Sequence, residues 1–114
     1  MSVVNSSDIV LAYMVKKQEV ARDGIIPEIS DICKKLAEQN VYTTIDFKYF
    51  NDKIISDTII DNLWYFISSD IIEEHSSEVI YKMTEYGNSI SNYLLQNFRE
   101  NQNQAWVIFN TILG

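Results

Sequence analysis

The sequence predicts a mainly α-helical α+β protein with one small β-hairpin, folded as a single domain over residues 1–114. Apolar residues recur at helical spacing in four segments, and each segment begins near a residue that commonly caps or opens a helix. Residues 71–83 show alternation instead, which is typical of two strands joined by a short turn. With 46% apolar residues, a chain of this length can bury a core without disulfides or a structural metal.

The first helix is predicted over residues 8–22. Ser6 and Ser7 precede it as candidate caps, and Gly24 is expected to end it. Its basic side chains lie toward its C-terminus, where the helix dipole favours them. Its apolar stripe consists of Val10, Leu11, Met14, Val15 and Ala21.

The second helix is predicted over residues 27–39, because Pro27 suits a first helical turn and Asn40 suits a stop. Its apolar residues Ile29, Ile32, Cys33, Leu36 and Ala37 follow the spacing of one helix face. The next segment, residues 41–55, allows two interpretations. Its β-branched content favours a strand over residues 41–47, and a capping threonine favours a short helix over residues 45–50.

The third helix is predicted over residues 56–69, with Ser56 or Asp57 as its cap. The expected buried face consists of Ile60, Leu63, Trp64 and Ile67, with Ile59 and Phe66 at its flanks. The expected outward face consists of Thr58, Asp61, Asn62 and Tyr65.

A hairpin over residues 71–83 follows, with its turn at residues 75–78. Thr84 then caps a last helix, predicted over residues 84–113. The polar segment at 101–104 contains no helix breaker, so the helix either continues through it or bends there.

Short motifs in residues 55–94 carry a family resemblance. Ser56, Asp57 and Thr58 stand at the cap of the third helix, Leu63 and Ile67 lie in its apolar run, and residues 83–87 (MTEYG) lead from the hairpin into the next helix. With the order of three helices, hairpin and helix, this pattern resembles the winged helix-turn-helix superfamily. The nearest members are PadR-like and MarR-like regulators and the small winged-helix proteins of archaea and their viruses. The resemblance implies a winged helix-turn-helix fold with an extended C-terminal helix, acting as a cytoplasmic DNA-binding transcriptional regulator.

That resemblance implies a double-stranded DNA site centred on the third helix. Thr58, Asn62 and Tyr65 would face a major groove, where such side chains contact bases and phosphates. Phosphates on either side of the groove would be neutralised by lysines. The lysines so placed are Lys34, Lys35, Lys48, Lys53 and Lys82.

The C-terminal segment carries more apolar side chains than a small winged domain needs to close its core. We expect it to form a homodimer, because large apolar anchors concentrate interface energy and the resembling families often dimerise through helices outside the DNA-binding unit. The predicted interface consists of Leu94, Leu95, Phe98, Trp106, Phe109 and Leu113. The alternative is that this segment folds back over the first helix of the same chain.

The charge of the chain departs from the family pattern. The net charge is −7, and residues 40–87 hold three lysines against nine carboxylates. No Lys or Arg lies between Asp57 and Val79, where these families usually place them. Because DNA affinity comes mostly from neutralising phosphates, a second hypothesis stands beside the first. It is an acidic winged-helix module that docks on a basic protein or mimics DNA.

Other functions find little support in the sequence. No Gly-rich phosphate loop or nucleophile elbow is present, so we predict neither an enzyme nor a cofactor. We expect a charged hairpin tip rather than a metal site at His75, Glu73, Glu74 and Glu78. Cys33, the single cysteine, reads as a buried thiol in a reducing compartment. No apolar run reaches the length of a membrane span, so no membrane association is expected.

Overall fold

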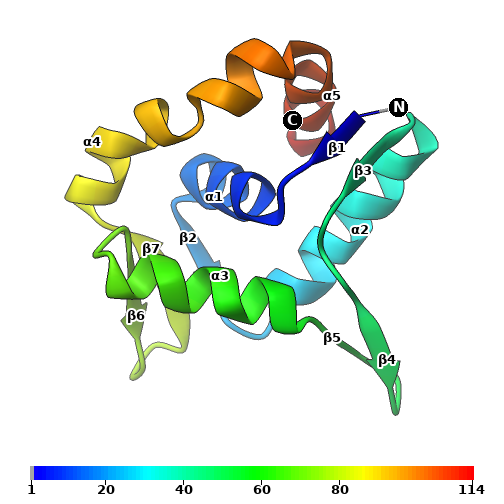
Figure 1. The fold of residues 1–114 in the computed structure, drawn as a ribbon. Helices are drawn as coiled ribbons and strands as arrows, with labels where there is room; N and C mark the ends of the chain where they lie inside the picture. The colour runs from blue at the N-terminus through cyan, green and yellow to red at the C-terminus, as the bar shows by residue number, and fades with distance from the viewer. Residues whose placement is uncertain (1) are drawn as a thin grey trace.

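A computed structural model describes residues 2–114 as an α+β fold of five α-helices, one π-helical turn and seven short strands (Figure 1). The helices are α1 (Ser6–Lys17), α2 (Ile25–Glu38), α3 (Asp57–Ser68), α4 (Glu85–Leu94) and α5 (Asn103–Leu113), with the π-helical turn η1 (Asn97–Asn101) between the last two. The strands are β1 (Ser2–Val4), β2 (Glu19–Ala21), β3 (Val41–Thr43), β4 (Lys48–Phe50), β5 (Lys53–Ile55), β6 (Ile72–His75) and β7 (Ile80–Met83). They form a parallel β1–β3 pair, an antiparallel sheet in the order β2–β7–β6, and a β4–β5 hairpin.

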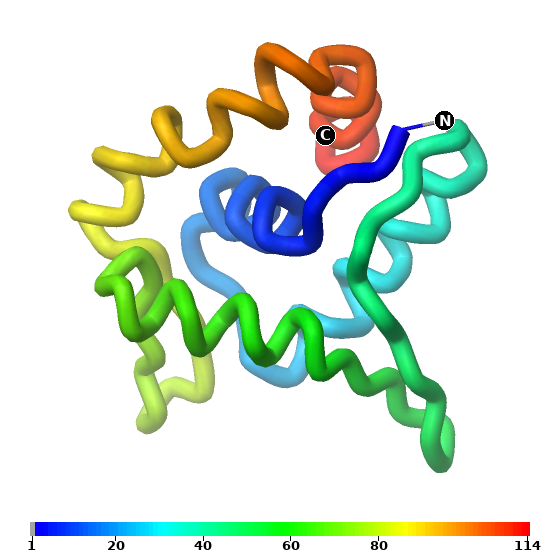
Figure 2. Tube along the Cα trace, viewed as in Figure 1, coloured from blue at the N-terminus to red at the C-terminus, as the bar shows by residue number. Residues whose placement is uncertain are grey.

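Helix α1 is the centre of the molecule, and the other elements surround it (Figures 1 and 2). All six residues of its middle, Ile9–Met14, are buried, as expected for a helix that is apolar on every side. Tyr13 is fully buried, and its hydroxyl donates a hydrogen bond to Glu28 Oε2 at 2.6 Å. Lys17 Nζ lies 3.3 Å from the other oxygen of the same carboxylate. Burial and then this contact with Glu28 raise the pKa of Tyr13 above its ordinary value.

The prediction that the first helix continues to residue 22 is wrong. α1 ends at Lys17, because Gln18 adopts a positive φ of 68° and its N–H bonds to the Met14 carbonyl at 2.7 Å. Strand β2 then pairs antiparallel with β7, which satisfies backbone groups that a longer helix would have used internally. Gly24 therefore precedes α2 instead of ending α1.

The second helix agrees closely with its prediction, with Ile25, Ile29, Ile32 and Leu36 buried. The segment after it contains no helix over residues 45–50, so that alternative is wrong. The strand alternative holds for Val41–Thr43, which pairs with β1. Residues 48–55 instead form a hairpin whose two turn residues, Asn51 and Asp52, have φ of 48° and 63°. Positive φ at both positions is the geometry of a type I′ turn, which suits the twist of a tight hairpin.

Helix α3 is capped as predicted, since Ser56 Oγ accepts a hydrogen bond from the Ile59 N–H at 3.1 Å. Its buried face, however, consists of Ile59, Leu63 and Phe66. The predicted burial of Ile60 and Trp64 is wrong, because these side chains are 36% and 60% exposed. Apolar residues lie on more than one side of this helix. Those on the side that packs against α1 are buried, and the others stay at least partly exposed.

The hairpin β6–β7 matches the hairpin predicted over residues 71–83 and is followed by α4. Thr84 Oγ accepts the Gly87 N–H at 2.8 Å and donates to the Asp70 carbonyl at 2.6 Å. A Cβ on Gly87 would lie 2.2 Å from the Ile71 carbonyl oxygen. The threonine and glycine of the MTEYG motif thus fasten the start of α4 against the segment that leaves α3.

The C-terminal segment bends at the π-helical turn, and α5 packs against α2. Leu95, Phe98 and Phe109 are buried within the single chain, and Phe98 makes an edge-to-face contact with Trp106 at a centroid distance of 5.0 Å. For these three residues the dimer-interface prediction is therefore wrong, because their apolar surface already closes the intramolecular core. No helix in residues 2–114 is both long enough and apolar enough to cross a membrane.

Candidate interaction surface

Helix α3 lies between two projecting hairpins. Figure 1 shows the β4–β5 hairpin, here called the arm, beside the N-terminal end of α3, and the β6–β7 hairpin, here called the wing, beside its C-terminal end. β5 leads into α3 through Ser56 alone, and β6 follows α3 after three residues. The exposed side chains of α3 are therefore framed by the arm and the wing.

The outward side of α3 combines apolar and acidic groups. Five of its exposed residues, here called the α3 face, follow helical spacing along this side: Asp57, Ile60, Asp61, Trp64 and Ser68. The indole of Trp64 is 60% exposed, and no Lys or Arg lies between Asp57 and Ser68. Such a surface can bury large apolar groups against a protein but repels phosphates.

The three residues of α3 predicted to face a major groove are not all exposed. Thr58 is half-buried, and its Oγ accepts the Asp46 N–H at 3.2 Å. Asn62 Oδ1 is shielded from solvent and has no hydrogen-bond partner among residues 2–114. Tyr65 is 65% exposed, but its ring stacks edge-on against Phe66 at a centroid distance of 5.7 Å. Two of the three polar groups are thus turned toward the protein.

The arm gathers most of the predicted phosphate-binding lysines. Lys48 and Lys53 lie on its two strands, and Lys34 Nζ lies 6.0 Å from the centroid of the Tyr49 ring. Tyr49 and Phe50 are each 65% exposed. The arm is therefore a basic and aromatic projection, although Lys48 Nζ lies 3.6 Å from Asp57 Oδ2 and is partly neutralised by it. Lys35 is exposed in the last turn of α2.

The wing is acidic, and its one lysine is flanked by carboxylates. Lys82 is the direct cross-strand partner of Glu19 on β2 and of Glu73 on β6. Facing side chains in such pairs lie close together, so Lys82 is surrounded by negative charge. His75 Nε2 lies 2.7 Å from Glu73 Oε2, and Arg22 pairs with Glu74 at 3.3 Å. Within residues 2–114 no group of three His, Cys, Asp or Glu residues is placed to hold a metal ion.

Three members of the predicted dimer interface stay at the surface in part. Leu94 is 38% exposed, and Trp106 and Leu113 are half-buried. Cys33 is also half-buried rather than fully buried, and burial raises the pKa of its thiol to about 12. A thiol with such a pKa stays protonated and weakly reactive at neutral pH.

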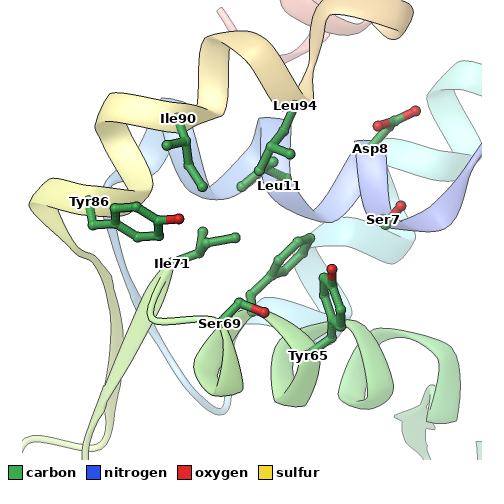
Figure 3. A pocket seen from close by; sticks show the side chains of 10 residues that line it. Ser7, Asp8, Leu11, Tyr65, Ser69, Ile71, Tyr86, Ile90 and Leu94 are labelled. Atoms are coloured by element: carbon green, nitrogen blue, oxygen red, sulfur yellow. The ribbon is translucent and has the colours of Figure 1, made fainter.

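A pocket of about 350 Å³ opens where α1, α3 and α4 meet (Figure 3). It is lined by Ser7, Asp8 and Leu11 of α1, by Tyr65, Phe66, Ser69 and Ile71 in and after α3, and by Tyr86, Ile90 and Leu94 of α4. The sequence does not predict this pocket, because its walls come from three elements far apart in the chain. The only available signal was the stripe of Tyr86, Ile90 and Leu94 at four-residue spacing on α4.

The sequence likewise does not predict the exposure of Ile60, Trp64, Tyr49 and Phe50, because helical spacing places the first two in the core and leaves the environment of the other two open. No protein-family model matches the chain, and searches of curated proteins and of solved structures found no similar protein.

Proposed function

We propose that this chain is a winged-helix protein-interaction module that docks on a basic partner protein through the α3 face. The observation that carries the proposal is the exposure of Ile60 and Trp64 on the same side of α3 as the carboxylates of Asp57 and Asp61. Tryptophan is the side chain most enriched among residues that dominate binding energy at protein interfaces. An indole left 60% exposed on a helix is therefore well suited to be buried by a partner.

The order of elements supports the winged-helix part of the proposal. α3 is the next helix after α2, with β3 and the arm between them, a hairpin follows α3, and the Thr84–Gly87 motif leads into α4. Strand β2 adds a third strand to this hairpin, in the order β2–β7–β6. These features match the order and motif on which the sequence resemblance rests.

The charge around α3 supports a partner with a basic rim. Residues 40–87, which include the arm, α3 and the wing, carry a net charge of −6 from three lysines and nine carboxylates. A surface with complementary Lys or Arg residues would be steered toward this region and held in register by it. A nucleic-acid-binding protein has such a surface, so the module could occupy the place of DNA on it.

Site-specific photo-crosslinking tests the proposal. A photoreactive phenylalanine analogue replaces Trp64 in one variant and Val107 in a control variant, because Val107 is 54% exposed on α5, outside the α3 face. Irradiation in the native cell should link position 64, but not position 107, to a protein with a basic surface. Crosslinking of position 64 to nucleic acid, or equal products at both positions, would reject the proposal.

A DNA-binding transcriptional regulator acting as a homodimer is the second candidate. The gathering of Lys34, Lys48 and Lys53 around the arm favours it, because these cations lie beside the N-terminal end of α3. Fluorescence anisotropy with random-sequence duplex at low salt tests this function. Binding at micromolar protein that is lost in the K48E/K53E double variant supports it, whereas no binding at low salt excludes it.

A further inference from the structure

The pocket between α1, α3 and α4 has two chemically different ends. Figure 3 shows Tyr86 and Ile71 at one end, Leu11 and Leu94 in the middle, and Asp8 with Ser7 at the other end. Its volume of about 350 Å³ lies within the range of small-molecule sites in proteins. An occupant that fits both ends is an elongated molecule with an apolar body and one polar head.

The carboxylate of Asp8 has no partner of opposite charge. No hydrogen bond or ion pair involves its side chain among residues 2–114, and it lies in the first turn of α1 with Ser7 beside it. Burial raises the pKa of Asp8, and its ionised form has the N-terminal end of α1 beside it but no cationic side chain to compensate its charge. A cation placed at this end would supply that compensation.

Three aromatic side chains contribute to the walls of the pocket. Tyr65 and Phe66 come from α3 and Tyr86 from α4, and neither tyrosine hydroxyl makes a hydrogen bond within the described chain. Figure 3 shows Tyr65 and Tyr86 on different walls. Such rings attract organic cations through their faces and bury apolar groups through their area. Together with one carboxylate, they favour an ammonium ion over a neutral or anionic molecule.

We propose that this pocket binds a small organic cation, an ammonium group attached to an apolar or aromatic body, with the ammonium at Asp8 and the body between Tyr65, Tyr86 and Leu94. The site is separate from the α3 face, because the pocket opens beside α4 whereas Trp64 and Ile60 do not line it. Binding there goes beyond docking on a partner protein and does not depend on it.

The test uses the whole chain and three probes of the same size. Two-dimensional NMR follows titration with 3-phenylpropylammonium, with neutral 3-phenylpropanol and with anionic 3-phenylpropionate at pH 7.5. The ammonium should bind saturably at millimolar concentration, with shifts confined to α1, α3 and α4. The alcohol should bind about fivefold more weakly, which is the effect of one ion pair at a partly exposed site, and the carboxylate should not bind.

Variants test whether Asp8 causes the preference for the ammonium probe. Asp8→Asn should remove the preference for the ammonium over the alcohol, whereas Asp31→Asn, which neutralises an exposed carboxylate of α2, should leave it unchanged. Three results would overturn the proposal: equal binding of ammonium and alcohol to the unaltered protein, no saturable binding, or an undiminished preference in the folded D8N variant. The first two need no variant, so the test holds even if D8N fails to fold.

Discussion

Burial changes the acid–base behaviour of single residues in this protein. Cys33 lies among the apolar residues of α2, where burial raises the pKa of its thiol from 9.0 to about 12. A raised thiol pKa in the folded state means that the unfolded chain loses this proton first. The contribution of the protonated Cys33 thiol to the free energy of unfolding is thus fully present below pH 9 and is lost as the pH rises toward 12. Tyr13, whose pKa is also raised, acts in the same direction.

Alkylation of Cys33 tests this conclusion. At pH 8 the folded protein should react with iodoacetamide at least about tenfold more slowly than the urea-unfolded chain, because the thiolate is the reactive form. The free energy of unfolding should also fall between pH 9 and 12, and less steeply in Cys33→Ala. Equal rates for folded and unfolded protein would show that the thiol is accessible and unperturbed.

The backbone packed against Gly87 leaves no room for a side chain at this position. Because an added Cβ would lie 2.2 Å from the Ile71 carbonyl oxygen, Gly87→Ala should force α4 away from its contact with the start of β6. We expect a loss of about 1–3 kcal/mol in the free energy of unfolding, the usual effect of overpacking, measured by urea denaturation.

Gly24→Ala is the matched control, since an added Cβ there meets nothing nearer than 3.7 Å. It should change stability by less than about 1 kcal/mol. If both variants unfolded at the same urea concentration, the close approach of α4 to Ile71 would be disproved.

At the scale of elements, two hairpins of opposite charge frame one helix. The arm carries Lys48 and Lys53, and the wing carries Glu73, Glu74 and Glu78. A hairpin is recognised from alternation and turn residues, and the wing was predicted on that basis. The arm was not, because its strands have three residues each and its Asn51–Asp52 turn lacks the usual glycine.

Charge reversal of the wing separates the two candidate functions. Replacing Glu73, Glu74 and Glu78 with lysine changes the net charge from −7 to −1, because each substitution adds two positive charges. Non-specific binding to duplex DNA should then strengthen and become steeply salt-dependent, as measured by fluorescence anisotropy. A complex with a basic protein should weaken.

The control carries the same reversal at Asp31, Glu38 and Glu100, which are exposed on other elements. If it binds DNA as strongly as the wing variant, net charge rather than the wing is responsible. Unchanged DNA binding in both variants would show that α3 and the wing are not part of a nucleic-acid-binding site.

At the scale of the whole molecule, one chain closes its own core around α1. The C-terminal segment supplies Leu95, Phe98 and Phe109 to that core by bending at the π-helical turn. Gln102 fastens the bend, since its Nε2 donates to the Val3 carbonyl at 2.8 Å. Apolar richness alone could not distinguish this intramolecular packing from a dimer interface, because both bury the same side chains.

The Phe98→Ala variant distinguishes intramolecular packing from a dimer interface. Because this ring is fully buried in a single chain, its removal should cost about 3–5 kcal/mol of folding free energy. The thermal midpoint should fall by the same amount at every protein concentration. A side chain required only for dimerisation would instead leave a folded monomer, visible by sedimentation. Val107→Ala, on the exposed side of α5, should have almost no effect.

The amino-acid sequence predicts those parts of the protein that depend on local spacing. The second helix, the Ser56 and Thr84 caps, the wing and the acidic balance of residues 40–87 follow from residues near one another in the chain. Hydrogen bonds at helix caps and turns form between neighbours, so their patterns are visible without the fold.

Only the tertiary structure decided which apolar residues became core and which became surface. Ile60 and Trp64 lie beside Ile59 and Leu63 in sequence, yet one pair is exposed and the other is buried against the rest of the chain. Strand β2, the bend at residues 97–102 and the pocket around Asp8 likewise depend on distant partners. The physical reason is that apolar burial has no direction of its own, so the partner that each helix meets selects the face that it buries.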